Sequence, residues 1–264
     1  MYQFTALISD RSRIAAFIYR KNVVPIRDEN PIYSTPVVVY ALIALNVAIF
    51  FYEASLSGPL LQLFINTWAL VPAELTCSLP VDLPQSLPCE IPVDNMVPEA
   101  EWITLFSSQF LHGSLVHLGG NMLFLWVFGN NIEDKLGSIK FLLFYLACGA
   151  LAALSQWIFE PGSIVPTVGA SGAIAGVMGA YILRFPRARI MTIFGFFIIP
   201  VPAYLFLGWW FIQQSFYSYA SLGATVDPGT GGVAYWAHAG GFVFGAILGP
   251  LMGLFADKRR DEWK

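Results

Sequence analysis

Few side chains in this chain of 264 residues are suited to catalysis, and most of them are polar residues beside or inside long apolar runs. The three histidines are His112, His117 and His238, and Ser171 opens a run within the sequence Gly169-Ala170-Ser171-Gly172. A serine becomes a nucleophile when a neutral histidine accepts its proton. Ser171 and His238 are the predicted nucleophile and general base. No acidic third member is evident in the runs, so a Ser–His dyad is expected.

A serine nucleophile also needs hydrogen-bond donors that stabilise the oxyanion of its tetrahedral intermediate. His117 and Asn121 are four residues apart, so they project from the same helix face, and both can donate. A helix beginning at Ser171 adds free backbone N–H groups and the positive end of its dipole. We therefore expect an oxyanion site built from the Ser171 N–H, His117 and Asn121. His112 precedes the helix and is expected to cap or brace it.

The apolar runs must be the elements that position these groups. With 56% hydrophobic and 12% charged residues, the composition is not that of a soluble protein. Runs of this length without Lys, Arg, Asp or Glu are candidate transmembrane helices. The six runs are Pro36–Tyr52, Leu115–Ile132, Phe141–Phe159, Ser171–Leu183, Val201–Phe216 and Ala234–Phe255. The predicted fold is an all-α, polytopic bundle of six transmembrane helices.

The domain organisation follows from the same runs. A six-helix membrane domain at residues 36–256 is expected between an N-terminal tail, residues 1–35, and a C-terminal tail, residues 257–264. The first run follows a polar tail without a small-residue cleavage site, which favours an anchor over a cleaved signal peptide.

The charged residues assign a side to each loop. All fourteen Lys and Arg residues lie before run one, between runs two and three, after run four, or after run six. We call this the basic side; the acidic side carries Glu74, Asp82, Glu90, Asp94, Glu99, Glu101, Glu160 and Asp227. Basic loops stay in the cytoplasm, so both termini are predicted to be cytoplasmic. A bacterial plasma membrane is the expected location, with the site opening to the extracytoplasmic side. The net charge of −3 sums two sides of a membrane and indicates no nucleic-acid partner.

The depth of the site follows from the length of run four. From Ser171 to Arg184 a helix rises about 20 Å, which is too short for a hydrocarbon core of about 30 Å. Ser171 should then lie about 10 Å below the acidic surface, bordering a water-filled cavity. His238 and Asn121 are expected about 6 and 9 Å deep, so the polar groups converge on one layer.

Small residues predict how two of the runs pack. Run six carries Ala237, Gly241, Gly245 and Gly249 at intervals of four, a pattern that allows close approach of helix backbones. In run four, Ser171 is followed by Gly172 and further small residues, so packing of these faces would bring Ser171 to His238. Each polar residue taken alone has a structural explanation, as packing or as an interhelical hydrogen bond. Their common side and depth favour a site.

The loop at about residues 56–101 is long and rich in proline. Its apolar stretch Leu60–Val71 is too short to span, and either lies in the membrane interface or packs on the bundle. Residues Arg189–Ile199 are expected to be interfacial on the basic side. Cys77 and Cys89 both lie in the long loop, and whether they form a disulfide is left open.

The motifs His112-x4-His117-x3-Asn121, Gly169-x-Ser171-Gly172 and Ala237-His238-x2-Gly241-x3-Gly245 together resemble those of the rhomboid intramembrane serine proteases. The resemblance covers about Pro36 to Phe255. It implies a six-helix bundle with Ser171 as nucleophile and His238 as base. It also implies an oxyanion hole made by the Ser171 amide, His117 and Asn121, with no metal or cofactor. Glu133 matches a structural acid of the family.

The resemblance further implies the substrates: single-span membrane proteins that enter from the lipid bilayer between runs two and five. Two positions depart from the family pattern. Trp102 is followed by Ile103 where many members have arginine, so the loop before run two is braced differently. Ala175 replaces an aromatic that packs on the base in some members, which leaves the orientation of His238 unexplained.

Other classes of protein fit less well. A zinc protease needs a motif such as HExxH, and an aspartyl protease needs paired carboxylates in its spans; the sequence has neither. An ion-coupled transporter usually needs membrane-embedded acids or two matching halves. The remaining alternative is a rhomboid-like protein that binds membrane helices in quality control without cutting them. The presence of both Ser171 and His238 argues against it.

Overall fold

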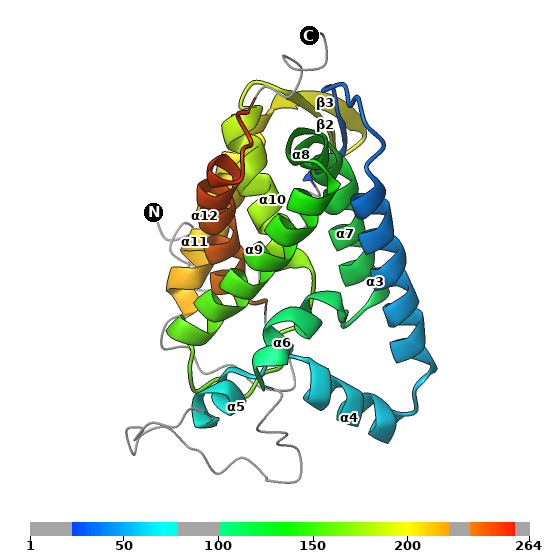
Figure 1. The fold of residues 1–264 in the computed structure, drawn as a ribbon, viewed down its shortest axis with the longest axis vertical. Helices are drawn as coiled ribbons and strands as arrows, with labels where there is room; N and C mark the ends of the chain where they lie inside the picture. Colours follow the sequence, from blue (N-terminus) through cyan, green and yellow to red (C-terminus); the bar gives the residue numbers. More distant parts are fainter. Residues whose placement is uncertain (1–22, 79–100, 222–232, 257–264) are drawn as a thin grey trace, which may run out of the picture.

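The computed structural model describes residues 23–78, 101–221 and 233–256, and these are mostly helical (Figure 1). A helix occupies each of the six predicted runs. These helices are α3 (Val37–Ser55), α7 (Leu115–Phe124), α9 (Ser138–Phe159), α10 (Ser171–Arg184), α11 (Ala203–Ser221) and α12 (Tyr235–Leu251). Helix α7 continues through a π-helical turn, η3 (Leu125–Gly129), into α8 (Asn130–Leu136).

The described helices differ in whether they could cross a membrane unaided. Helices α3 and α9 are long and apolar enough to do so. A third span results if the bent pair Glu101–Phe110 and Leu115–Leu136 is counted as one. The fold is thus that of a helical membrane protein.

Helix α10 lies at the centre of the bundle, with α9 and α12 packed against it (Figure 1). Every residue from Gly172 to Tyr181 is buried. The predicted contact between the small-residue faces is present, because a Cβ added at Gly241 would strike the carbonyl of Gly172. One turn further along, a Cβ at Gly245 would strike the backbone of Gly176. The two helices therefore pack backbone to backbone, which only glycine permits at these positions.

Short helices cover the acidic end of the bundle: α4 (Gly58–Trp68), α5 (Pro72–Cys77), α6 (Glu101–Ser107) and the 3-10 turn η2 (Ser108–Phe110). No residue of α4 is buried, which favours the interfacial position over packing on the bundle. Glu74 in α5 is buried, and burial, with the nearby Glu101 carboxylate, raises the pKa of Glu74 to about 7. Part of the acidic charge counted from the sequence is therefore neutralised near neutral pH.

The cysteines of the long loop are only partly accounted for. Cys77 is disulfide-bonded, and Cys89 lies outside the described residues. Cys148 is a free, buried thiol in α9.

The all-α prediction omitted a sheet at the basic end. Strands β1 (Val23–Asp28), β2 (Arg189–Phe194) and β3 (Phe197–Pro202) form an antiparallel sheet in that order. The segment predicted as interfacial, Arg189–Ile199, is the β2–β3 hairpin, whose two-residue turn places Gly195 at a φ of 63°. The fifth run was predicted to begin at Val201, and α11 begins at Ala203, directly after the last residue of β3.

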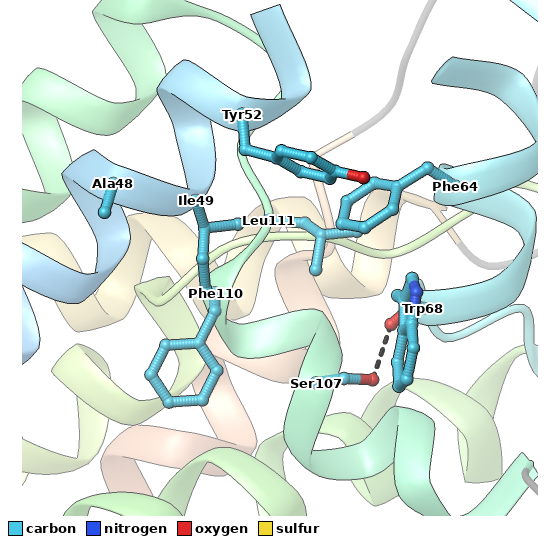
Figure 2. Close-up of a pocket in the computed structure, with 8 residues that line it drawn as sticks. All are labelled: Ala48, Ile49, Tyr52, Phe64, Trp68, Ser107, Phe110 and Leu111. Atoms are coloured by element: carbon cyan, nitrogen blue, oxygen red, sulfur yellow. Dashed lines mark hydrogen bonds between the residues drawn. The ribbon is translucent and has the colours of Figure 1, made fainter. Parts of the chain in front are cut away.

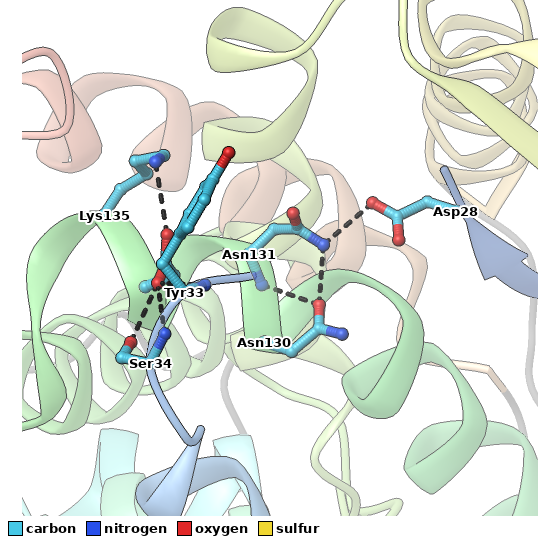
Figure 3. Close-up of polar contacts among 7 residues, drawn as sticks. Asp28, Tyr33, Ser34, Asn130, Asn131 and Lys135 are labelled. Carbon is cyan, nitrogen blue, oxygen red and sulfur yellow. Dashed lines mark hydrogen bonds and ion pairs between the residues drawn. The ribbon is translucent and has the colours of Figure 1, made fainter. Parts of the chain in front are cut away.

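Polar contacts tie this sheet to the bundle (Figure 3). Asn131 of α8 donates a hydrogen bond to Asp28 at the end of β1. Asp28 also accepts from the hydroxyl of Tyr181 in α10. The next segment is held by Asp134, which accepts from the backbone N–H groups of Tyr33 and Ser34 at 2.9 Å each. The N-terminal strand is thereby fixed to the helix that carries Ser171.

Glu133 has a clear structural role at the start of α3. Its carboxylate accepts hydrogen bonds from the N–H groups of Val38 and Val39 at 3.0 and 2.9 Å, and from the Ser138 hydroxyl at 2.7 Å. These are the second and third residues of α3, the N–H groups that a helix cap ordinarily satisfies. A carboxylate also suits the positive end of the helix dipole.

Replacing Glu133 with glutamine is expected to destabilise the protein. The amide retains one acceptor oxygen and turns an NH2 group toward a buried N–H. The free energy of unfolding should therefore fall by about 2 to 3 kcal/mol. Thermal unfolding in detergent measures this against Glu29→Gln, a change at an exposed acid near β1. Equal melting temperatures for the two variants would contradict the capping role.

Candidate active site

The predicted nucleophile and base are in contact. The Oγ of Ser171 lies 2.7 Å from Nε2 of His238, within hydrogen-bond distance. Ser171 is the first residue of α10, and His238 is the fourth residue of α12. The close packing of these two helices allows the Ser171 and His238 side chains to reach one another.

The segment before Ser171 is fixed by backbone hydrogen bonds to the acidic-end helices. Leu70 and Thr167 form an antiparallel bridge, with N···O distances of 3.2 and 2.7 Å. The N–H of Gly169 donates to the carbonyl of Ser108 at 2.8 Å. Gly169 has a φ of 122°, which favours glycine and turns the chain into α10. The start of α10 is therefore set by the loops around it.

His117 and Asn121 converge on the same segment from α7. A Cβ added at Gly169 would lie 2.8 Å from His117 Nε2 and 3.5 Å from Asn121 Nδ2. The His117 and Asn121 side chains therefore lie against the backbone two residues before Ser171. Glycine at 169 leaves that space open. Of the predicted supporting glycines, Gly169 borders the His117 and Asn121 side chains, Gly172 leaves room for Ala152 of α9, and Gly241 packs α12 against α10.

His112 braces the Asn121 side chain. Its Nε2 lies 3.0 Å from Nδ2 of Asn121, and its ring centroid lies 5.1 Å from that of His117. The backbone N–H of His112 donates to the buried carboxyl of Glu53 in α3 at 3.3 Å. The bracing role expected for His112 thus has a structural basis, and Glu53 is a member of the network that sequence reasoning missed.

The first turn of α12 is held by α9. The side-chain oxygen of Gln156 accepts from the N–H of Ala237 at 3.3 Å, directly before His238. The rings of Phe159 and Trp236 stack with centroids 3.7 Å apart. These contacts position the backbone that carries the base.

Helix α11 contacts the His238 ring itself. Gln214 Oε1 lies 2.8 Å from His238 Nδ1, and the Trp210 ring lies 5.8 Å from the imidazole, centroid to centroid. The ring beside His238 is therefore that of Trp210, while position 175 is alanine. Sequence reasoning missed both residues. The available signal was a polar amide four residues after a tryptophan within an apolar run, a spacing that puts both on one helix face.

A separate cavity of about 420 Å³ lies at the acidic end between α3, α4 and η2 (Figure 2). It is lined by Ala48, Ile49, Tyr52, Phe64, Trp68, Ser107, Phe110 and Leu111. Its lining offers no nucleophile with a base, and the Ser107 hydroxyl is engaged with the Trp68 carbonyl at 2.7 Å. In the described part of the chain, no cluster of three or more His, Cys, Asp or Glu side chains is arranged to hold a metal ion.

Several curated proteins are similar to this chain. The Rhomboid protein 1, mitochondrial, of Saccharomyces cerevisiae is 31% identical over 164 residues, which is 61% of this chain and 44% of the yeast protein. The Rhomboid protease GluP of Bacillus subtilis is 31% identical over 168 residues, covering 62% of this chain and 30% of GluP. The Presenilin-associated rhomboid-like protein A, mitochondrial, of Danio rerio is 31% identical over 109 residues, covering 40% of this chain and 27% of that protein. The chain thus spans less than half the length of these relatives.

The predicted plasma-membrane location is contradicted by these relatives, because the yeast and Danio rerio proteins are mitochondrial. The prediction failed for a physical reason. The distribution of basic residues reports which side of a membrane a loop occupies, and it carries no information about which membrane that is.

The site motifs and the matched region coincide. The sequence model of the Rhomboid domain matches residues 99–255, which include α7, α10, α12 and every predicted site residue from His112 to Gly241. The chain belongs to the rhomboid family.

Proposed function

We propose that this protein is an intramembrane serine endopeptidase that cleaves transmembrane segments of membrane proteins. The observation that carries the proposal is the 2.7 Å contact between Ser171 Oγ and His238 Nε2, beside the donors of His117 and Asn121. Family membership supports the same class of reaction, since one relative is the bacterial Rhomboid protease GluP.

The proposed reaction uses each of these groups in turn. His238 accepts the proton of Ser171 as Oγ attacks the scissile carbonyl carbon. The developing oxyanion receives hydrogen bonds from the Ser171 N–H, His117 and Asn121. His238 then donates its proton to the departing amine, and a water molecule activated by the same imidazole hydrolyses the acyl-enzyme. No metal or cofactor takes part in this scheme.

The proposed setting is a bundle of six membrane helices with both described chain ends on the basic side. Single-span proteins would enter from lipid between α7 and α11, and the site would open toward the acidic side. The mitochondrial relatives support a mitochondrial membrane as the location.

Loss of one oxyanion donor should leave the fold intact and slow cleavage. Asn121→Ala is expected to lower kcat by about 10²- to 10³-fold, the usual effect of removing such a donor. His117→Ala should act in the same direction with little change in KM. Asn66→Ala in exposed α4 is the matched control and should cleave at the wild-type rate. Wild-type kcat in both site variants would rule out this oxyanion site.

The proposal is tested by reconstituting the protein in lipid vesicles with a tagged single-span substrate. Cleavage within the membrane segment supports an endopeptidase. Binding of the substrate without any cleavage, by folded protein and across a panel of such substrates, would instead support the helix-binding alternative.

A further inference from the structure

We infer that Gln214 and Trp210 of α11 are positioning residues that hold His238 in the orientation and tautomer needed to activate Ser171. This inference deepens the proposed function and rests on it. It assigns to α11 a direct part in preparing the general base.

The tautomer of His238 follows from its two hydrogen bonds. To accept the proton of Ser171, Nε2 must be unprotonated, so the ring proton must reside on Nδ1. Nδ1 lies 2.8 Å from the side-chain oxygen of Gln214, which can only accept. Gln214 therefore favours the one neutral tautomer in which His238 is a base toward Ser171.

A neutral amide orients the His238 imidazole differently from a carboxylate. Gln214 cannot take up a proton and carries no net charge into the membrane interior, where a charged acid would be costly. Its carbonyl dipole still stabilises the imidazolium that forms when His238 accepts the serine proton. The pair Ser171 and His238 thus has a third member that orients the base without ionising.

Gln214 holds the His238 imidazole at Nδ1, and Trp210 sets the plane of that imidazole. It lies four residues before Gln214, on the same face of α11. Its ring lies 5.8 Å from the His238 ring, centroid to centroid, and 6.2 Å from that of Phe242, one turn along α12. Ala175, fully buried on α10, carries no ring that could do this.

Because both contacts come from α11, the base is oriented only while α11 packs against α12. A displacement of about 1 Å would stretch the Gln214 hydrogen bond beyond useful length. Activation of Ser171 is therefore coupled to the position of the helix beside which the substrate is proposed to enter.

The test compares Gln214→Leu, Gln214→Glu and Gln213→Leu in the full chain. Gln213 is adjacent in α11, whereas the hydrogen bond to His238 Nδ1 comes from Gln214. Gln214→Leu should lower kcat about tenfold or more, less than the 10²- to 10⁴-fold contribution of the base itself, with KM changed by less than about twofold. Its rate of labelling by a fluorophosphonate, which needs no substrate docking, should fall by the same factor.

Gln214→Glu keeps an acceptor of the same length. Because burial opposes ionisation of a carboxyl, kcat should return to within about threefold of wild type only at alkaline pH, where the carboxylate forms. Gln213→Leu should match wild type. Melting temperatures identify any variant with a damaged fold; Gln214→Ala, which adds no bulk, then replaces the leucine variant.

This experiment distinguishes the positioning role of Gln214 from the protease activity itself. Wild-type kcat in Gln214→Leu, or a loss in folded Gln214→Glu that remains equal to that of Gln214→Leu at alkaline pH, overturns the positioning role and leaves the protease assignment standing. Cleavage that persists in Ser171→Ala overturns the protease assignment itself.

Discussion

Ser171→Ala is expected to abolish cleavage of a single-span membrane substrate. The substitution removes only the Oγ atom, which lies 2.7 Å from His238 Nε2. In serine proteases, loss of the nucleophile or the base lowers kcat by roughly 10⁶-fold, so no product should be detected in a routine assay. The measurement is cleavage of the tagged substrate in vesicles, followed by gel analysis.

Two further sets of variants serve as controls for Ser171→Ala. His238→Ala should be as inactive as Ser171→Ala, and the double variant no worse, because the two residues act as a unit. Ser55→Ala, at an exposed serine near the end of α3, should cleave normally. Undiminished cleavage by Ser171→Ala would refute the proposed mechanism.

Gly245→Ala is expected to damage both the fold and the site. The added Cβ would strike the backbone of Gly176, so α10 and α12 must separate. Overpacking of this kind costs about 1 to 3 kcal/mol of stability. Since one helix carries Ser171 and the other His238, a shift of about 1 Å should also cost on the order of 10²-fold in kcat.

Gly208→Ala is the matched control for this prediction. Gly208 lies in α11 with open space where its Cβ would stand. Alanine there should leave activity unchanged and stabilise the helix by up to about 1 kcal/mol. The two variants are compared by thermal unfolding in detergent and by cleavage. If Gly245→Ala melted and cleaved as Gly208→Ala does, close packing of α10 on α12 would not be what positions the site.

The residue pattern was sufficient to predict that Ser171 and His238 lie close together. Glycines at intervals of four in α12, and the small residues that follow Ser171, required two helices to approach closely, and that approach determines where His238 lies. The six helices followed from runs without charge. Their ends differ from the predicted runs by a few residues, as expected when polar residues extend a helix beyond the apolar core.

The contacts from α11 could not be predicted in this way. This helix is apolar on most of its faces, so its sequence does not indicate which face meets α12. Only the packed structure shows that Gln214, and not Gln213, reaches His238.

The sheet, and the partners of Glu133 at the start of α3, could not be predicted for two further reasons. Residues 189–202 form a short apolar stretch, and periodicity alone cannot distinguish a strand from a helix in such a stretch. Glu133 caps α3 through Val38 and Val39, which precede it by 95 and 94 residues, a distance over which local sequence rules give no guidance. The family resemblance marked Glu133 as structural without giving its partners.

Covalent labelling with a fluorophosphonate, followed by peptide mass mapping, measures whether His238 activates Ser171. One adduct, on Ser171, is expected in the wild type and none in His238→Ala. Labelling of Ser171 at the wild-type rate in folded His238→Ala, or cleavage by a wild-type protein whose Ser171 never reacts, would contradict activation of Ser171 by His238.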